Sequence, residues 1–306
     1  MLSKNTVKSS LVLSLLFALF LNFSLTNTNA ANSEQVKTVT VTLKSNNKTS
    51  LPSLGREDFL VSEDGTKQEV ISVVAATAEN APINLAIVVQ DGISQVNTEL
   101  GTLKQFLKNL PTGSQVMITY LNGSFTQVLQ PFTTDLESAT QKIRVVNSFS
   151  NGPASPYLNL IDVMKQFNGK AHGRNQILLI SNGVDSLLND FSPPNNLYLN
   201  QAIKAAQQEN ISIYSIFANG TNSRRVFLGQ NNLNYLAEET GGYAFIMGTG
   251  FVTFDAPLKQ FREMLDNQYV VTYKSTNDEN GFRRVKITTD FSNIKVTTLS
   301  GYTAKK

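Results

Sequence analysis

The sequence contains no cysteine, no tryptophan and a single histidine, His172. Without cysteine the chain cannot form a disulfide scaffold, use a thiol nucleophile or carry a thioether-linked lipid on its leader. One histidine supplies at most one imidazole base, and no Gly-x-Ser-x-Gly sequence is present to offer it a serine nucleophile. His172 lies in the polar segment GKAHGRNQ, where a histidine is most often solvated. These absences argue against a hydrolase or another enzyme.

Charge is also scarce, at 16% of residues, whereas apolar residues make up 41%. The composition is that of a globular protein. The first thirty residues carry two lysines and no acidic residue, so removing them lowers the formal charge from +3 to +1. We expect the short basic pairs Arg224-Arg225 and Arg283-Arg284 at the surface, and no aromatic residues are interleaved with them. We therefore expect no nucleic-acid partner.

The longest apolar run, LVLSLLFALFL, lies at the N-terminus between Leu11 and Leu21 and follows two lysines. It is shorter than the roughly 18 residues that a membrane-spanning helix needs. A small, polar stretch with Ala30 and Ala31 follows it. This pattern predicts a cleaved signal peptide over residues 1–30, export to a periplasm or the exterior, and no membrane span after cleavage.

Residues 31–80 have the pattern of β-strands. Val36–Lys44 alternates valine with threonine or lysine, which predicts a half-buried strand. A second strand, an Asp64-Gly65 turn and a third strand follow, and Asp-Gly is typical of a tight hairpin. Asp58, Glu63 and Asp64 lack the spacing of a calcium loop, so we expect them to be solvated charges around the turn.

From Ile83 onward, apolar strands alternate with helical segments. NLAIVVQ is a continuous apolar run, typical of a parallel strand buried on both faces. We expect helices over 98–109, 136–146 and 200–210, another helix capped by Ser155 with proline at its first position, and a strand over 243–247. This alternation predicts an α/β fold: a doubly wound, Rossmann-like, mostly parallel sheet with helices on both faces.

After Gln268 the sequence is rich in β-strand patterns again. Neither flank is long enough to bury its own apolar face, because an independent sheet needs about three or more strands. We therefore expect residues 31–80 and 268–306 to pair as one small β domain beside an α/β domain over residues 81–267.

Ligands of open α/β sheets bind at the carboxyl ends of the strands, where the segment AIVVQDGISQ (86–95) would lie. Here the sequence resembles von Willebrand factor A-type domains, in particular their bacterial exported relatives. The segments that carry the resemblance extend over nearly all of the chain after the leader. They are LGREDFLVSEDGTKQEVISV (54–73), ISIYSIFANG (211–220), YLAEETGGYAF (235–245), LDNQYVVTYKSTNDENGFRRVKITT (265–289) and NIKVTTLSGYTA (293–304).

The resemblance implies a metal-ion-dependent adhesion site, formed by Asp-x-Ser-x-Ser after the first strand, a later threonine and a later aspartate. In this sequence the leading aspartate falls on Gln90, the first serine on Gly92 and the second on Ser94. The threonine falls on Ala154 and the later aspartate on Asn182. Of the family's ligands, Ser94 alone is retained.

Mg²⁺ prefers oxygen ligands that include one or two carboxylates, and Gln90 and Asn182 offer only neutral oxygens. We expect a fold that has lost its metal, with no cofactor or at most weak Mg²⁺ or Ca²⁺ binding. Two alternatives stay open. One is a shifted oxygen cage made of Asp91, Ser94, Ser155 and Asp185, although adjacent strand residues point in opposite directions. The other is a cation held mainly by a partner.

The sequence thus predicts an exported, non-enzymatic protein-interaction or adhesion-type module. Its runner-up is a divalent-metal-dependent adhesion domain that uses the shifted ligands, and a hydrolase comes third. We expect a protein partner to contact the degenerate metal-site face, which consists of Gln90, Asp91, Gly92, Ser94, Ala154, Ser155, Asn182 and Asp185.

Overall fold

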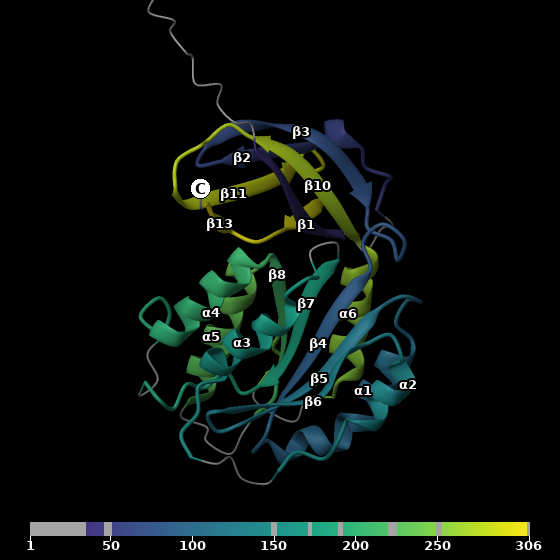
Figure 1. Ribbon diagram of the computed structural model, residues 1–306, viewed down its shortest axis with the longest axis vertical. Coiled ribbons are helices and arrows are strands. Elements are labelled where there is room, and N and C mark those ends of the chain that lie inside the picture. Colours follow the sequence, from purple (N-terminus) through teal and green to yellow (C-terminus); the bar gives the residue numbers. More distant parts are fainter. Residues whose placement is uncertain are drawn as a thin grey trace, which may run out of the picture. The chain divides into compact units, whose positions relative to one another are not determined.

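Two β-sheets organise the chain in this computed structural model (Figure 1). The structure describes residues 35–45, 51–147, 152–170, 173–188, 192–219, 225–248 and 253–304. The predicted signal peptide and His172 lie outside these residues. One sheet has six strands in the order β6-β5-β4-β7-β8-β9, and the other has seven in the order β12-β1-β10-β3-β2-β11-β13.

The six-stranded sheet is mostly parallel. β4 pairs in parallel with β5 and β7, β8 pairs in parallel with β7 and β9, and β6 runs antiparallel to β5. All residues of β4 except its last are buried, as expected for a strand covered on both faces. The strands are β4 (Ile83–Gln90), β5 (Gln115–Asn122), β6 (Phe125–Thr133), β7 (Arg174–Ser181), β8 (Ile211–Phe217) and β9 (Ala244–Phe245).

Helices cover both faces of this sheet. Successive strand residues point to opposite faces, so an apolar strand such as β4 presents side chains that need to be buried on each face. On one face, the core around Ile87 contains residues of α1 (Leu100–Lys108), α2 (Leu136–Gln141) and α6 (Asp255–Asp266). On the other, the core around Val88 contains residues of α3 (Pro156–Met164), α4 (Leu197–Gln208) and α5 (Val226–Glu239). Short 3-10 helices are η1 (Arg56–Asp58), η2 (Ser94–Glu99) and η3 (Lys165–Phe167).

Several element boundaries differ from the predicted ones. α3 begins after Ser155 with a proline at its start, as predicted. α2 ends at Gln141, not near Val146, because the backbone of Arg144 bonds instead to the hydroxyl of Tyr120. α4 begins earlier than predicted, since the side chain of Asn196 caps it. The strand predicted over 243–247 is reduced to the two residues of β9.

The seven-stranded sheet is antiparallel and combines strands from both ends of the chain. β1 pairs with β10 and β12, β3 pairs with β2 and β10, and β11 pairs with β2 and β13. Ser33–Lys306 forms a single compact unit, so the domain boundaries at residues 80 and 267 stay a prediction. The strands are β1 (Gln35–Ser45), β2 (Phe59–Glu63), β3 (Thr66–Ala75), β10 (Gln268–Ser275), β11 (Gly281–Thr289), β12 (Ile294–Thr297) and β13 (Gly301–Ala304).

The hairpin between β2 and β3 corrects one prediction about charge. Asp64 and Gly65 have positive φ angles of 50° and 84°, as a tight Asp-Gly turn requires. Glu63, however, is not a solvated turn residue: it is 2% exposed and accepts hydrogen bonds from Tyr273, Ser275 and Tyr302. Burial of a carboxylate is tolerated where hydroxyl donors replace its hydration in this way.

Arg283 is likewise buried, although its basic pair is predicted at the surface. Its guanidinium lies 3.4 Å from the carboxylate of Asp64 and donates to the carbonyl of Glu279. The hairpin turn therefore has its own counter-charge inside the β-sheet, and this arginine is not available to an external anion.

A buried polar junction marks the places where the chain passes between the two sheets. Arg174, at the start of β7, donates to the carbonyls of Ala81 and Leu265 and to the side-chain oxygen of Gln268. Burial lowers the pKa of Arg174 to about 10. Gln268 donates onward to the hydroxyls of Thr42 and Tyr214. One arginine thus binds both connecting segments.

Candidate functional site

The candidate site lies at the carboxyl ends of β4, β5 and β7 (Figure 1). The chain passes from β4 to β5 on one side and later returns to β7 on the other, so the strand order reverses at β4. In open α/β sheets this is the position where ligands bind.

The two amides predicted at the carboxylate positions lie together and connect neighbouring strand ends. The side-chain oxygen of Gln90 accepts a hydrogen bond from the Ser181 hydroxyl at 2.5 Å and one from the Asn182 backbone N–H at 3.3 Å. The side-chain oxygen of Asn182 accepts from the backbone N–H of Val184 at 3.0 Å. Both amide oxygens are therefore engaged in holding the loop after β7.

Asp91, directly after β4, belongs to a different network. Its side chain is fully buried, and five N–H groups donate to it. The two guanidinium nitrogens of Arg144 donate one to each carboxylate oxygen, both at 3.0 Å. The backbone and side-chain N–H groups of Asn147 donate at 2.8 and 2.9 Å, and the side chain of Asn122 at 3.1 Å. A carboxylate with this many donors has no lone pair directed at an added cation.

Arg144 is the residue of this end that the sequence analysis did not single out. Its guanidinium also donates to the Val145 carbonyl at 2.8 Å and lies 4.0 Å from the centre of the Tyr120 ring. Hydrogen bonding to Asp91 raises the pKa of Arg144, so its guanidinium stays protonated. A bidentate arginine supplies Asp91 with the positive charge that a metal ion would otherwise provide. The one signal in the sequence is an aspartate directly after a buried strand, because a carboxylate that is buried at such a place needs hydrogen-bond donors or a cation.

Ser155 and Asp185 form a second buried network. The Ser155 hydroxyl donates to Asp185 at 2.7 Å and accepts from the backbone N–H of Leu158, which makes it the cap of α3. The other carboxylate oxygen of Asp185 accepts from the backbone N–H groups of Leu187 and Leu188, at 3.1 and 3.3 Å. Both side chains are completely buried.

The remaining predicted residues lie between or beside these networks. Ala154 donates its N–H to the Ser186 hydroxyl at 2.7 Å, and its carbonyl accepts from Ser186. Gly92 has a φ angle of 88° and donates to the carbonyl of Asn147. Ser94 is exposed at the start of η2. The structure thus unites Gln90 with Asn182 and Ser155 with Asp185, whereas Asp91 bonds to neither pair.

No group of three or more His, Cys, Asp or Glu side chains that could hold a metal occurs in the described part of the chain. The expectation that the site binds no metal, or binds one only weakly, stays a prediction. The four residues of the shifted cage do not form one group. Asp91 bonds to Arg144, Ser155 bonds to Asp185, and Ser94 is exposed. Among the same described residues, no helix combines the length and the apolar character needed to cross a membrane.

Close packing of α5 fixes the loop after β7. Gly229 of α5 lies so near Asn182 that a Cβ atom there would come within 1.9 Å of the Asn182 carbonyl oxygen. The next carbonyl, that of Gly183, accepts from the Tyr157 hydroxyl at 2.5 Å and from the Asn232 side chain at 3.1 Å. This loop is therefore held by both α3 and α5.

Three apolar side chains surround these hydrogen-bonded loops and are exposed. Phe125 is 71% exposed at the β5–β6 turn, where it pairs with Asn122. Val145, at 64%, directly follows Arg144, and Leu187, at 36%, donates its N–H to Asp185. Each is one or a few residues from a side chain of the two networks.

No family model matches the sequence, and no curated protein matches it. Solved structures that it is similar to include an aerotolerance-related membrane protein from Bacteroides fragilis NCTC 9343, at 10% identity and a TM-score of 0.47, covering 60% of this chain and 98% of that one. Another is a conserved hypothetical protein, BatB, from Bacteroides thetaiotaomicron, at 13% identity and a TM-score of 0.44, with the same coverage. A third is a von Willebrand factor type A protein from Catenulispora acidiphila, at 12% identity and a TM-score of 0.44, covering 89% of this chain and 74% of that one.

Proposed function

We propose that this chain is a non-enzymatic interaction module that binds a protein partner, without a metal ion, through the loops at the carboxyl ends of β4, β5 and β7. The observation that carries the proposal is the full hydrogen bonding of Asp91 by Arg144, Asn147 and Asn122. An internal guanidinium neutralises the carboxylate that lies nearest the strand end predicted to bind metal.

Metal binding would have to disrupt contacts that already satisfy the carboxylates. Mg²⁺ would displace Arg144 from Asp91 or sit next to its positive charge, and it would compete with the hydrogen bonds that Asp185 already accepts. Mg²⁺ also gives up its hydration water reluctantly, and the neutral oxygens of Gln90 and Asn182 repay little of that cost. The shifted cage of Asp91, Ser94, Ser155 and Asp185 is therefore the less favoured alternative.

A protein partner fits the apolar side chains around these loops. Phe125, Val145 and Leu187 are exposed where solvent would otherwise favour polar residues. Apolar and aromatic side chains that stand on a rigid support lose little conformational entropy on binding, and the two networks provide that support. The hydrogen-bonding groups of Ser94 and its loop would then form the polar rim of the interface.

The surroundings of Ser155, a buried serine of the candidate site, do not support catalysis. The Ser155 hydroxyl donates directly to Asp185 with no imidazole between them, and both are buried. The helices on both faces of the six-stranded sheet support a doubly wound, Rossmann-like interpretation, with residues 31–80 and 268–306 as a small β domain. The leader pattern over residues 1–30 supports export of this module to a periplasm or the exterior.

The proposal is tested by quantitative capture from a cell-envelope fraction, with and without a chelator. The bait is the chain without residues 1–30, as wild type and as the Phe125→Asp, Val145→Asp and Phe282→Asp variants. Phe282 is an exposed phenylalanine of β11 and serves as the matched control. We expect one protein to be retained equally with chelator and by Phe282→Asp, and to be lost with Phe125→Asp and Val145→Asp. Retention that requires a divalent metal would favour the adhesion-site alternative.

A further inference from the structure

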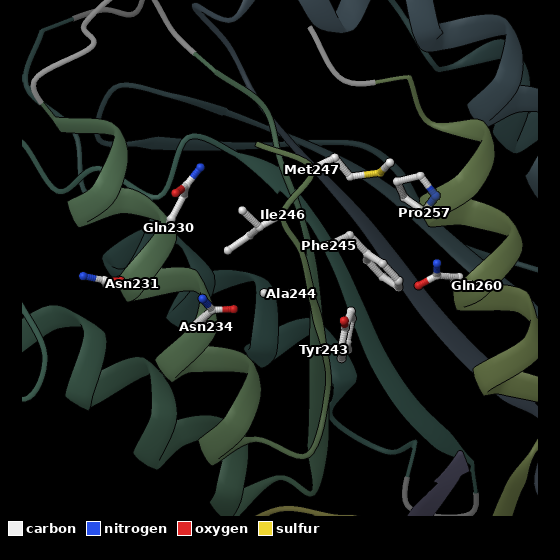
Figure 2. Close-up of a pocket in the computed structure, with 10 residues that line it drawn as sticks. All are labelled: Gln230, Asn231, Asn234, Tyr243, Ala244, Phe245, Ile246, Met247, Pro257 and Gln260. Carbon is white, nitrogen blue, oxygen red and sulfur yellow. The ribbon is translucent and has the colours of Figure 1, made fainter. Parts of the chain in front are cut away.

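An uncharged cavity of about 390 Å³ lies at the edge of the six-stranded sheet and shares no residue with the candidate site. Figure 2 shows β9 between α5 and α6, with the cavity between the two helices. The volume falls in the range of roughly 300–1,000 Å³ that is usual for ligand sites. The lining residues are Gln230, Asn231, Asn234, Tyr243, Ala244, Phe245, Ile246, Met247, Pro257 and Gln260.

The floor of the cavity is the outer edge of β9, the last strand of its sheet. The carbonyl of Tyr243 accepts from the backbone N–H of Ser215 in β8 at 3.0 Å. Backbone groups of successive strand residues alternate in direction, so the N–H and carbonyl of Ala244 point away from β8, toward the outer edge. Ala244 itself lines the cavity and is only 9% exposed. Polar backbone groups at a sheet edge can pair with the strand of another chain.

Primary amides form both walls of the cavity. Asn231 and Asn234 are exposed on α5, one turn apart, and Gln260 is exposed on α6. Gln230 donates to the carbonyl of Gly248 at 3.0 Å and so holds the segment that follows β9. Figure 2 shows the side chains of Ala244 and Ile246 toward α5 and those of Phe245 and Met247 toward α6. The strand edge between them is therefore flanked by amides on each side.

We propose that this edge binds an uncharged, extended peptide segment of a partner chain, which adds as a strand beside β9. Each primary amide offers one acceptor and a donor group, the same pair that a peptide group presents. None of the ten lining residues is charged, so a charged segment would lose hydration without meeting an opposite charge. A free backbone edge favours a peptide over a sugar, because main-chain hydrogen bonds supply affinity in strand addition. The proposal is independent of the function assigned to the loops above.

The test begins with a phage-displayed library of random dodecapeptides selected on the chain without residues 1–30. The best uncharged peptide is then titrated by fluorescence anisotropy against wild type, Ala244→Pro, Asn234→Ala, Gln260→Ala and Gln201→Ala. Proline at position 244 removes an N–H that points outward and leaves the bonds to β8 in place. Gln201 is an exposed amide of α4, outside the cavity, and is the matched control.

We expect Ala244→Pro to weaken binding by about tenfold or more, the two alanine variants to weaken it less, and Gln201→Ala to leave it unchanged. Because Ala244→Pro could affect folding, wild-type protein is also studied by NMR hydrogen exchange, where bound peptide should slow exchange of the Ala244 amide. Two versions of the peptide are also compared, one methylated at the odd-numbered backbone nitrogens and one at the even-numbered ones. One version should lose binding and the other should keep it. The proposal would be overturned by unchanged exchange at Ala244, by equal binding of the two methylated versions, or by binding of glycans but not peptides.

Discussion

Replacing Arg144 by methionine removes the positive charge that neutralises Asp91 and keeps the aliphatic part of the side chain. Two of the five donors to the carboxylate are lost, both from the guanidinium, while those of Asn147 and Asn122 remain. Asp91 cannot move to water easily, because its side chain is fully buried.

The expected loss in the free energy of unfolding is about 3 kcal/mol. Removing one partner of a buried ion pair costs roughly 3–5 kcal/mol. We take the low end because the Arg144 side chain is 28% exposed, so solvent already screens part of the interaction. For a chain of this size the loss corresponds to a melting temperature about 5 °C lower.

The assay is urea unfolding followed by circular dichroism at pH 7. Lys165→Met is the control, because it breaks an exposed pair with Asp162 and should cost less than about 0.5 kcal/mol. Adding Asp91→Asn to Arg144→Met should recover part of the stability, since it removes the unpaired charge. If Arg144→Met and Lys165→Met unfold at the same urea concentration, Arg144 does not neutralise Asp91 as described.

Three further substitutions test other parts of the structure, each by urea unfolding. Gly229→Ala should destabilise the protein by about 2 kcal/mol or more, because the added Cβ would overlap the Asn182 carbonyl. The control is Gly101→Ala in α1, where nothing lies within 4 Å of an added Cβ, and it should stabilise the protein by about 0.5–1 kcal/mol. Equal effects of the two substitutions would contradict the close packing of α5. Glu63→Ala should lower the free energy of unfolding by about 2–4 kcal/mol, because it leaves three hydroxyls without the carboxylate that accepts from them. The control Glu57→Ala changes an exposed residue and should have a negligible effect. A loss for Glu63→Ala as small as that for Glu57→Ala would refute the buried network. Arg174→Met should cost about 3 kcal/mol because the carbonyls of Ala81 and Leu265 lose their donor, and a neutral result would show that the junction between the sheets does not depend on it.

Elements whose signal is local could be predicted from the sequence. The continuous apolar run of β4 requires burial on both faces, and Ser155 with Pro156 specifies the start of α3 through capping. The convergence of Gln90 and Asn182 was also predictable, because the carboxyl ends of neighbouring parallel strands meet at one edge of the sheet.

Features that depend on distant residues could not be predicted in this way. Arg144 is 53 positions from Asp91 and falls in a segment with helical spacing, so nothing local shows that it leaves the helix to bond to Tyr120 and Asp91. The close approach of Gly242 to the backbone of Ile213, just before β9, is likewise a tertiary contact that no local pattern shows.

The burial of Glu63 did have a signal in the sequence. Every second residue of β2 points to the same face and is buried: Phe59, Val61 and Glu63. A strict reading of the period-2 pattern therefore places Glu63 on the inner face, although the residue type argues for solvent. Partners that would make this burial tolerable, Tyr273 and Tyr302, lie more than two hundred positions away.

The central claim, that the site works without a metal ion, is tested most directly by isothermal titration of the chain lacking residues 1–30 with Mg²⁺, Mn²⁺ and Ca²⁺. We expect no saturable binding tighter than about 1 mM, because Asp91 is already neutralised by Arg144, and Asp185 is buried and accepts three hydrogen bonds from its own surroundings. Saturable binding tighter than about 1 mM that disappears in Asp91→Ala or Asp185→Ala would contradict the account.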